Sequence, residues 1–235
     1  MIGIIAAMPQ EIAHIQASMK VTSTKKVGNR EFLTGTINNK DVTVVLARIG
    51  KVAASTTATT LINLFNVSAV ILTGVAGGIH PEVKIGDIVV GTNFIQHDMD
   101  ASESKMFKKF EIPLLGTDKI HADDSLINKA TISSKEVLKK MFPENSVHVG
   151  LMGAGDQFIA SKVKVDSLRK EIPDLLCVEM EGAAAAQVCF EFGVPFVSIR
   201  SISDNANDDA ATDFMKFVEE HAAPVSNAIV QSLLN

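Results

Sequence analysis

The sequence predicts an α/β fold in which helices cover a mixed β-sheet. Short apolar segments alternate with segments of helical length along nearly the whole chain, which is the order expected of a layered α/β protein. The 235 residues can bury one sizeable core, so we expect a single domain over residues 1–235. Hydrophobic residues make up 46% and charged residues 21%, a globular balance that excludes a disordered chain.

Eight short apolar or β-branched segments predict strands. They cover residues 2–7, 31–36, 42–47, 70–73, 85–90, 147–152, 175–178 and 195–203. The sequence Asn-Asn-Lys-Asp at 38–41 predicts a hairpin turn between the second and third. Glycine-rich segments at 74–78 and 150–155 predict turns where a strand passes into a loop.

Six segments predict helices between these strands. Besides a first helix that starts at Pro9, they cover residues 51–65, 123–141, 161–172, 181–192 and 208–234. Pro9 followed by Glu11 is typical of a first helical turn, and Ser161 is a suitable N-cap. Pro224 predicts a break or bend in the last helix.

Residues 96–116 are polar and irregular, which predicts a long functional loop. Either Asp123 or Asp124 is expected to cap the helix that follows. Within the loop, His97-Asp98-Met99-Asp100 resembles a metal cluster, but one His and two Asp in a polar loop are more typical of a solvated turn. We therefore expect no metal and no cofactor.

Charge and composition narrow the possible partners. The net charge of −5 opposes binding to a phosphate backbone, so nucleic acid is not expected as a partner. No apolar run reaches the length of a membrane span and the N-terminus lacks the features of a signal peptide, so we expect no membrane and a cytoplasmic location. Cys177 and Cys189 fit buried thiols. Twelve Phe supply all the aromatic side chains, since Tyr and Trp are absent.

Ligands in open α/β sheets bind beyond the carboxyl ends of the strands, and the chemically informative residues of this sequence follow strands. Glu179 and Glu181 come directly after a predicted strand in apolar surroundings. Buried carboxylates need a partner such as ligand hydroxyls or Arg. Arg200 and Asp204 lie four residues apart at the end of the last strand and lean to one face. The alternative for the two glutamates is that acids at a helix start complement the helix dipole. The alternative for Arg200 and Asp204 is a structural ion pair, or an Asp204 cap of the final helix.

Five ordered motifs carry a resemblance that spans nearly the whole chain. They are Met8-x-x-Glu11, Thr73-Gly74-x-Ala76-Gly77-Gly78, Asp156-x-Phe158-Ile159, Val178-Glu179-Met180-Glu181 and Arg200-x-Ile202-Ser203-Asp204. Together they resemble the 5′-methylthioadenosine/S-adenosylhomocysteine nucleosidases of the nucleoside phosphorylase superfamily. The resemblance implies a three-layer α/β/α sandwich with a mixed central sheet and a homodimer. It also implies hydrolysis of the N-glycosidic bond of these nucleosides, releasing adenine and a 5′-thioribose.

The resemblance also implies residue roles. Asp204, supported by Ser203, would protonate adenine N7, and Glu11, helped by Arg200, would activate the water. Glu181 and Met180 would hold the ribose. The other residues implied to bind substrate are Met8, Ile49, Ala76, Gly77, Phe107, Phe158, Ile159 and Glu179.

The chemistry agrees with two carboxyl groups in different protonation states. Protonating N7 makes adenine a neutral leaving group, while the water needs an acceptor. A phosphate-dependent phosphorylase is one alternative, but an ionised Glu11 about 4 Å from a doubly charged phosphate costs about 8 kcal/mol. A purine-binding protein without activity is another, although binding alone does not require Glu11.

Two departures from the family pattern concern the 5′ side and the water. Val75 stands where many relatives carry Ser or Thr. The loop at 96–116 lacks the Tyr of common relatives, so a Phe such as Phe107 or Phe110 is expected to cover the 5′ substituent and to favour a thioalkyl group. If a second subunit covers the pocket, the loop around Phe107 is the segment expected to reach it. The sequence leaves open the preference among methylthioadenosine, S-adenosylhomocysteine, 5′-deoxyadenosine and futalosine-type nucleosides.

Overall fold

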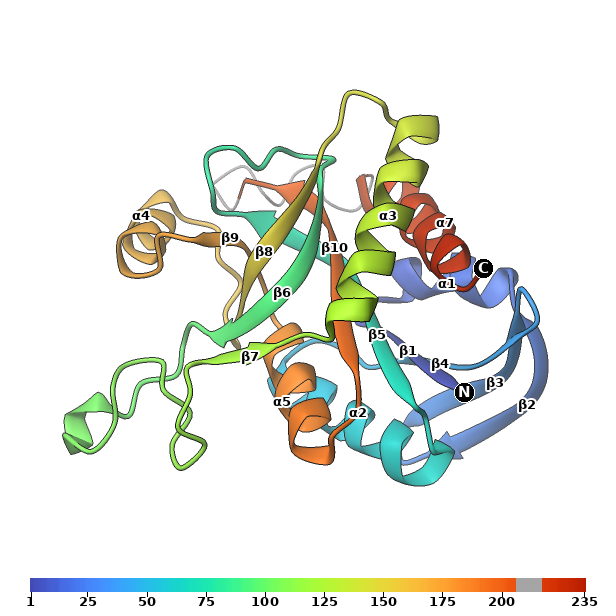
Figure 1. Ribbon diagram of the computed structural model, residues 1–235, viewed down its shortest axis with the longest axis horizontal. Helices are drawn as coiled ribbons and strands as arrows, with labels where there is room; N and C mark the ends of the chain where they lie inside the picture. The colour runs from blue at the N-terminus through green and yellow to red at the C-terminus, as the bar shows by residue number, and fades with distance from the viewer. Residues whose placement is uncertain (206–216) are drawn as a thin grey trace.

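A computed structural model describes residues 1–205 and 217–235 of the chain (Figure 1). Ten strands form one mixed sheet that runs in the order β10-β6-β8-β9-β5-β1-β4-β3-β2, with β7 beside β6. The strands are β1 (Ile2–Ala6), β2 (Lys20–Val27), β3 (Arg30–Ile37), β4 (Lys40–Leu46), β5 (Ala69–Gly78), β6 (Ile88–Gln96), β7 (Lys119–His121), β8 (Val147–Ala154), β9 (Leu175–Glu179) and β10 (Phe196–Asp204). The predicted mixed sheet is confirmed.

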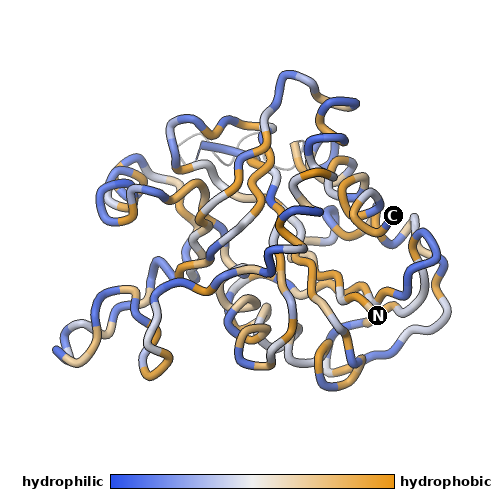
Figure 2. The backbone as a smooth tube through the Cα atoms, in the orientation of Figure 1, coloured by the Kyte–Doolittle hydropathy of each residue, from blue (hydrophilic) through white to orange (hydrophobic). Residues whose placement is uncertain are grey.

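Helices cover both faces of this sheet. They are α1 (Pro9–Ala17), α2 (Lys51–Phe65), α3 (Asp124–Met141), α4 (Lys162–Glu171), α5 (Gly182–Phe192) and α7 (Ala223–Leu233). Helices α2 and α5 pack on each other, while α1 and α3 pack on α7. Figure 2 shows apolar residues concentrated along the central strands and polar residues at the outer loops. No helix among the described residues is long and apolar enough to cross a membrane.

Five of the strands close on themselves. Strand β10 pairs in parallel with β5 and antiparallel with β6, β6 continues through β8 to β9, and β9 returns to β5 at Gly77 and Gly78. This closure was not anticipated from the sequence. It brings the ends of β5, β9 and β10 together, although these ends lie far apart in the chain, at Gly78, Glu179 and Asp204.

The turn predicted at 74–78 is wrong, because these residues are strand, and the one predicted at 150–155 is wrong up to Ala154, since only Gly155 follows the strand. Strand β5 continues through Gly78 and β8 through Ala154. Missing side chains make room for neighbours: a Cβ at Gly150 would lie 2.8 Å from Leu176, and one at Gly78 would lie 3.3 Å from Ile202. Strands that need this close approach use glycine without ending.

Other differences have local causes. Strand β6 begins at Ile88 rather than at residue 85, because Gly86 has a φ of +90° and the Asp87 side chain accepts the amides of Lys84 and Ser146. Strand β2 was missed because nearly every residue of it is exposed, which leaves no apolar face to detect. The three-residue β7 was missed as well.

The last predicted helix is described only in part, since residues 206–216 lie outside the described residues. A π-helical turn over Val218–Ala222 precedes α7, and Pro224 lies in the first turn of α7. The change of helix type next to Pro224 agrees with the predicted bend, because proline cannot donate a backbone hydrogen bond.

Asp123 rather than Asp124 caps α3, since its side chain accepts the amide of Leu126 at 2.9 Å. We expect Asp123→Ala to lower the free energy of unfolding by about 1 kcal/mol in urea denaturation. Asp124→Ala is the matched control and should cost less than half as much at about 0.5 M salt, which screens its interaction with the helix dipole. Equal losses in the two variants would contradict the capping assignment.

Candidate active site

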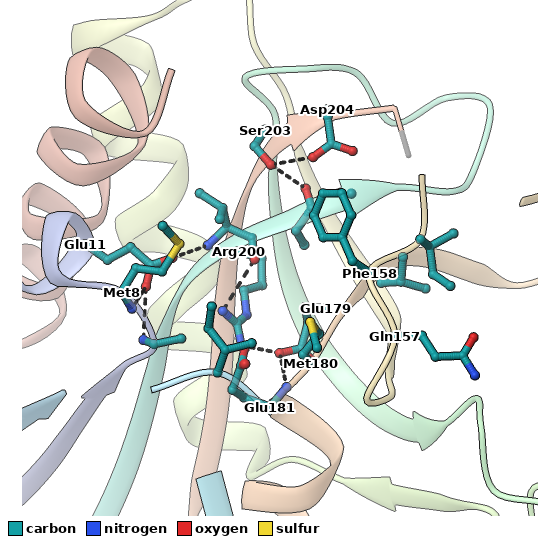
Figure 3. A pocket seen from close by; sticks show the side chains of 17 residues that line it. Met8, Glu11, Gln157, Phe158, Glu179, Met180, Glu181, Arg200, Ser203 and Asp204 are labelled. Carbon is teal, nitrogen blue, oxygen red and sulfur yellow. Dashed lines mark hydrogen bonds and ion pairs between the residues drawn. The ribbon is translucent and has the colours of Figure 1, made fainter. Parts of the chain in front are cut away.

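A cavity opens where β1, β5, β9 and β10 end, opposite the segment that follows β8 (Figure 3). Among the described residues, its lining combines small and apolar side chains with four acidic residues and one arginine. The lining residues are Ala7, Met8, Glu11, Ile49, Val75, Ala76, Gly77, Gln157, Phe158, Ile159, Val178, Glu179, Met180, Glu181, Arg200, Ser203 and Asp204.

All of the predicted site residues except Phe107 line this cavity. Gln157 also lines the cavity and was not predicted, although it lies between the motif residues Asp156 and Phe158. Ala7 and Val178 were also left out, because a small or apolar residue in or next to a strand carries no signal that separates a cavity wall from the core.

The buried guanidinium of Arg200 lies at the centre of the polar end. Strand β10 places this side chain with only 1% of its surface exposed. Its Nη2 atom pairs with Glu179 and lies 3.2 Å from Glu181 Oε2, while Nη1 donates to the carbonyl of Val75 at 3.4 Å. A buried charge needs such partners, and here they come from two strands and a helix start.

Glu11 is held at the first turn of α1. One carboxylate oxygen accepts the amides of Ala7 at 3.0 Å and Met8 at 2.8 Å, and the other accepts the amide of Val75 at 3.1 Å. Burial raises the pKa of Glu11 above its ordinary value of 4.5, and Arg200 and the backbone amides counter part of this rise. A desolvated carboxylate of this kind is suited to accept a proton from a bound water.

Gly74 in β5 makes room for both groups. A Cβ at this position would lie 2.4 Å from Nη1 of Arg200 and 2.8 Å from Oε1 of Glu11. The glycine of the motif Thr73-Gly74-x-Ala76 is therefore required by the side chains that converge on it and not by a turn.

Glu179 holds the start of α5. Its carboxylate accepts the amides of Glu181 at 3.0 Å and Gly182 at 2.8 Å, in addition to the pair with Arg200. Burial raises the pKa of this carboxyl group, and the arginine opposes the rise. Because its oxygens are engaged by the protein, Glu179 is suited to positioning Arg200 and Glu181.

Glu181 presents its carboxylate to the cavity from the residue before α5. Its Oε1 atom accepts the amide of Gly50 at 2.9 Å, and Oε2 faces Arg200. Gly50 has a φ of +103°, which favours glycine, and it precedes α2. The start of α2 therefore fixes one face of this carboxylate.

Ser203 and Asp204 lie at the end of β10. The Ser203 hydroxyl donates to Asp204 Oδ2 at 2.7 Å and lies 3.4 Å from the carbonyl of Ala76. Both residues are buried, with 7% and 6% of their surface exposed. In Figure 3 the Phe158 ring lies near this pair, whereas Glu11 and Met8 lie across the cavity.

Apolar side chains form the walls and the mouth. Met8, Met180 and Ile159 line the interior, while Ile49 and Phe158 are 55% and 57% exposed. Exposed apolar side chains at a cavity mouth indicate that a ligand or another chain covers them.

Phe107 does not line the cavity of its own chain, so the structure does not place it with the other predicted residues. It lies in the segment between β6 and β7, which projects away from the sheet in Figure 1. Asp98, which the sequence placed in a solvated turn, instead pairs with Lys51 at 2.7 Å. The segment contains one short 3₁₀ turn over Ser102–Ser104.

Comparison with known proteins identifies the family. Residues 1–235 match the Phosphorylase superfamily. The chain belongs to this superfamily. Its relatives include the 5′-methylthioadenosine/S-adenosylhomocysteine nucleosidase of Shewanella sp. (strain W3-18-1), which is 40% identical over 92% of this chain and 91% of that protein.

Solved structures of phosphorylase-superfamily members have the same fold. A 5′-methylthioadenosine/S-adenosylhomocysteine nucleosidase from Neisseria meningitidis, in complex with methylthio-immucillin-A, superposes with a TM-score of 0.92 at 33% identity, covering 99% of this chain and 97% of that one. Futalosine hydrolase of Helicobacter pylori superposes with a TM-score of 0.88 at 35% identity, covering 99% and 96%. The chain is thus a phosphorylase-superfamily member whose relatives are named as nucleosidases and whose structural neighbours include a futalosine hydrolase.

The raised pKa of Glu11 makes the stability of this phosphorylase-superfamily protein depend on pH. The folded state holds the Glu11 proton more tightly than the unfolded chain, whose pKa is near 4.5. The contribution of Glu11 to the free energy of unfolding is therefore lost as the pH rises above 4.5, and the loss is complete once the pH exceeds the pKa of Glu11 in the folded state. We expect Glu11→Gln to gain stability relative to the wild type as the pH rises from about 4 to about 8.

The measurement is urea denaturation of both proteins across this range. Glu136→Gln on the exposed face of α3 is the control, and its difference from the wild type should change little with pH. The quantity compared is the free energy of unfolding of Glu11→Gln minus that of the wild type. If this difference stays constant, or shifts in favour of the wild type as the pH rises, burial does not raise the pKa of Glu11.

Proposed function

We propose that the protein hydrolyses the N-glycosidic bond of 5′-methylthioadenosine and S-adenosylhomocysteine, releasing adenine and the 5′-thioribose. One observation carries this proposal. A single cavity holds a Ser203–Asp204 pair on one side and Glu11 on the other, with the only arginine of the described lining already paired to carboxylates.

The Asp204 side of the cavity suits the base. Asp204 would deliver a proton to adenine N7, with the Ser203 hydroxyl fixing the carboxyl group through its 2.7 Å bond. The Phe158 ring near this pair would stack on the base, and the backbone around Ile159 would bind its edge. Protonation at N7 lets adenine leave as a neutral molecule.

The opposite side suits the sugar and the water. Glu181 would accept hydrogen bonds from the ribose hydroxyls, with Met180 and Met8 packed against the sugar. Glu11 would orient and deprotonate the attacking water. The carboxylates of this side would also stabilise the positive charge that develops on the ribose as the bond to adenine breaks.

The same side is poorly suited to phosphate, which favours a hydrolase over the phosphorylase alternative. Among the described lining residues, Arg200 is the only basic side chain. Its guanidinium is already balanced by Glu179 and Glu181, and Glu11 lies buried next to it. A doubly charged anion would therefore meet more negative than positive charge.

We further propose a homodimer in which Phe107 of one copy covers the 5′ substituent in the other. Apolar side chains are exposed at the cavity mouth, where Ile49 and Phe158 lie, and on the projecting loop, with Met106 at 75% and Leu114 at 94%. Exposed apolar groups on two separate segments support a protein interface. A cytoplasmic location stays a prediction from the sequence.

The central test is adenine release from methylthioadenosine in phosphate-free buffer. We expect turnover without phosphate and a loss of kcat of at least about 100-fold in Asp204→Asn, because the variant cannot donate a proton to the base. Binding of methylthioadenosine by calorimetry should persist in the variant. Strict dependence of the wild type on phosphate would identify a phosphorylase, and tight binding without adenine release would identify a binding protein.

The role of Phe107 is tested by solution mass and by competition among nucleosides. We expect a dimer, and we expect Phe107→Ala to raise the KM for methylthioadenosine about tenfold through lost apolar contact. Competition among methylthioadenosine, S-adenosylhomocysteine, 5′-deoxyadenosine and futalosine should show a preference for the thioalkyl nucleoside. A fully active monomer would exclude this arrangement.

A further inference from the structure

The start of α2 lies between the two halves of the cavity. The amide of Gly50 donates to the Glu181 carboxylate at 2.9 Å, and the next amide, of Lys51, donates to Asp156 Oδ1 at 2.8 Å. Glu181 lies on the sugar side, whereas Asp156 begins the segment that carries Phe158. Two successive amides of one helix start therefore contact both sides of the site.

The start of α2 also belongs to a closed ring of hydrogen bonds that joins Lys51, Asp98 and Asp156. The Lys51 ammonium donates to Asp98 Oδ1 at 2.7 Å, and the amide of Asp156 donates to the other oxygen of Asp98 at 2.8 Å. The Asp156 carboxylate accepts the Lys51 amide and so returns the ring to its first residue. Gln96 adds a second acceptor for the ammonium at 3.2 Å.

The ring is partly buried, since Asp156 is exposed whereas Lys51 and Asp98 are shielded. The side chains of Lys51 and Asp98 are 19% and 13% exposed, so the pair is well shielded from water. Burial opposes ionisation of Asp98, but the lysine and the Asp156 amide outweigh it and lower the pKa of this carboxyl group. A Cβ at Gly155 would lie 2.5 Å from the His97 ring, so the backbone at this point has little room to move.

Phe158, the aromatic wall of the site, lies between this ring and the buried Ile159, and the amide of Gly155 also donates to the carbonyl of Glu179 at 3.2 Å. Phe158 is more than half exposed, and Gln157 contacts only Lys164 among the hydrogen bonds of its side chain in the described residues. The ring at Asp156 lies two residues before Phe158. A displacement of this anchor would therefore move the aromatic wall relative to Glu181.

We propose that Asp98 is a positioning residue of this site, which, through Lys51 and Asp156, sets the place of the Phe158 wall against the Glu181 carboxylate. The proposal rests on the proposed function for the identity of the base and the sugar. It differs from the residue roles above because Asp98 does not line the cavity and acts only through its partners.

The first test compares Asp98→Asn with the wild type. The variant keeps the shape of the side chain and loses the charge, so we expect the KM for methylthioadenosine to rise about tenfold with a smaller change in kcat. The affinity for adenine alone, measured by calorimetry, should fall by a similar factor, because the substitution displaces the Phe158 ring that stacks on the base. Asp174→Asn breaks the exposed pair with Lys119 and is the matched control, which should leave both quantities unchanged.

The second test asks whether the effect passes through Phe158. In a Phe158→Ala background the aromatic wall is absent, so Asp98→Asn should weaken adenine binding by less than twofold. Should Asp98→Asn fail to fold, as judged by its thermal melting, Lys51→Gln breaks the same pair from its other end and enters the same cycle. An equal weakening with and without Phe158, or no weakening in either, would overturn the proposal.

Adenine binding separates this proposal from the proposed function. A wild type that binds adenine but releases none from methylthioadenosine would refute the hydrolase, while the cycle with Phe158 would still decide the role of Asp98. A wild type that binds no adenine would overturn the positioning proposal as well, because the Phe158 wall would then have no base to hold.

Discussion

The arrangement of the site depends on one buried cation. The guanidinium of Arg200 lies among carboxylates that come from α1, β9 and the start of α5, and none of these side chains could be buried at an acceptable cost without it. The closed set of strands, with β1 paired beside β5, brings these elements together, and Gly74 leaves the space in which they meet. The geometry of the acids on the sugar side is thus set by the need to neutralise a single arginine.

Much of the architecture could be predicted because it is encoded locally. Helix α2 has the bounds that the small-residue pattern predicted, and Ser161 caps α4 by accepting the amide of Lys164. The residues around the cavity could be named because they follow strands and fall in five ordered motifs. The order of the motifs does not show how close their residues lie in space, so the pairing of Arg200 with Glu179 and Glu181 could be seen only in the structure.

What could not be predicted depends on contacts between distant segments. The glycines of β5 suggested a turn because a sequence does not show that Arg200 occupies the space beside Gly74. Strand β2 has no apolar face and is held by backbone pairing with β3. Asp98 looked like part of a solvated turn, since its partner Lys51 is far away in the chain. Phe107 was assigned to the site from a resemblance, and a single chain does not bring it there.

The way the sheet ends limits how two copies can associate. At one end the strands close on themselves, which leaves few free backbone groups there. At the other end β2 is an edge strand whose exposed Lys20, Lys25 and Lys26 would repel the same strand of another molecule. Extension of the sheet from copy to copy is therefore disfavoured, so assembly has to proceed through side chains of helices and loops, and uncontrolled strand-to-strand aggregation is suppressed by the same lysines.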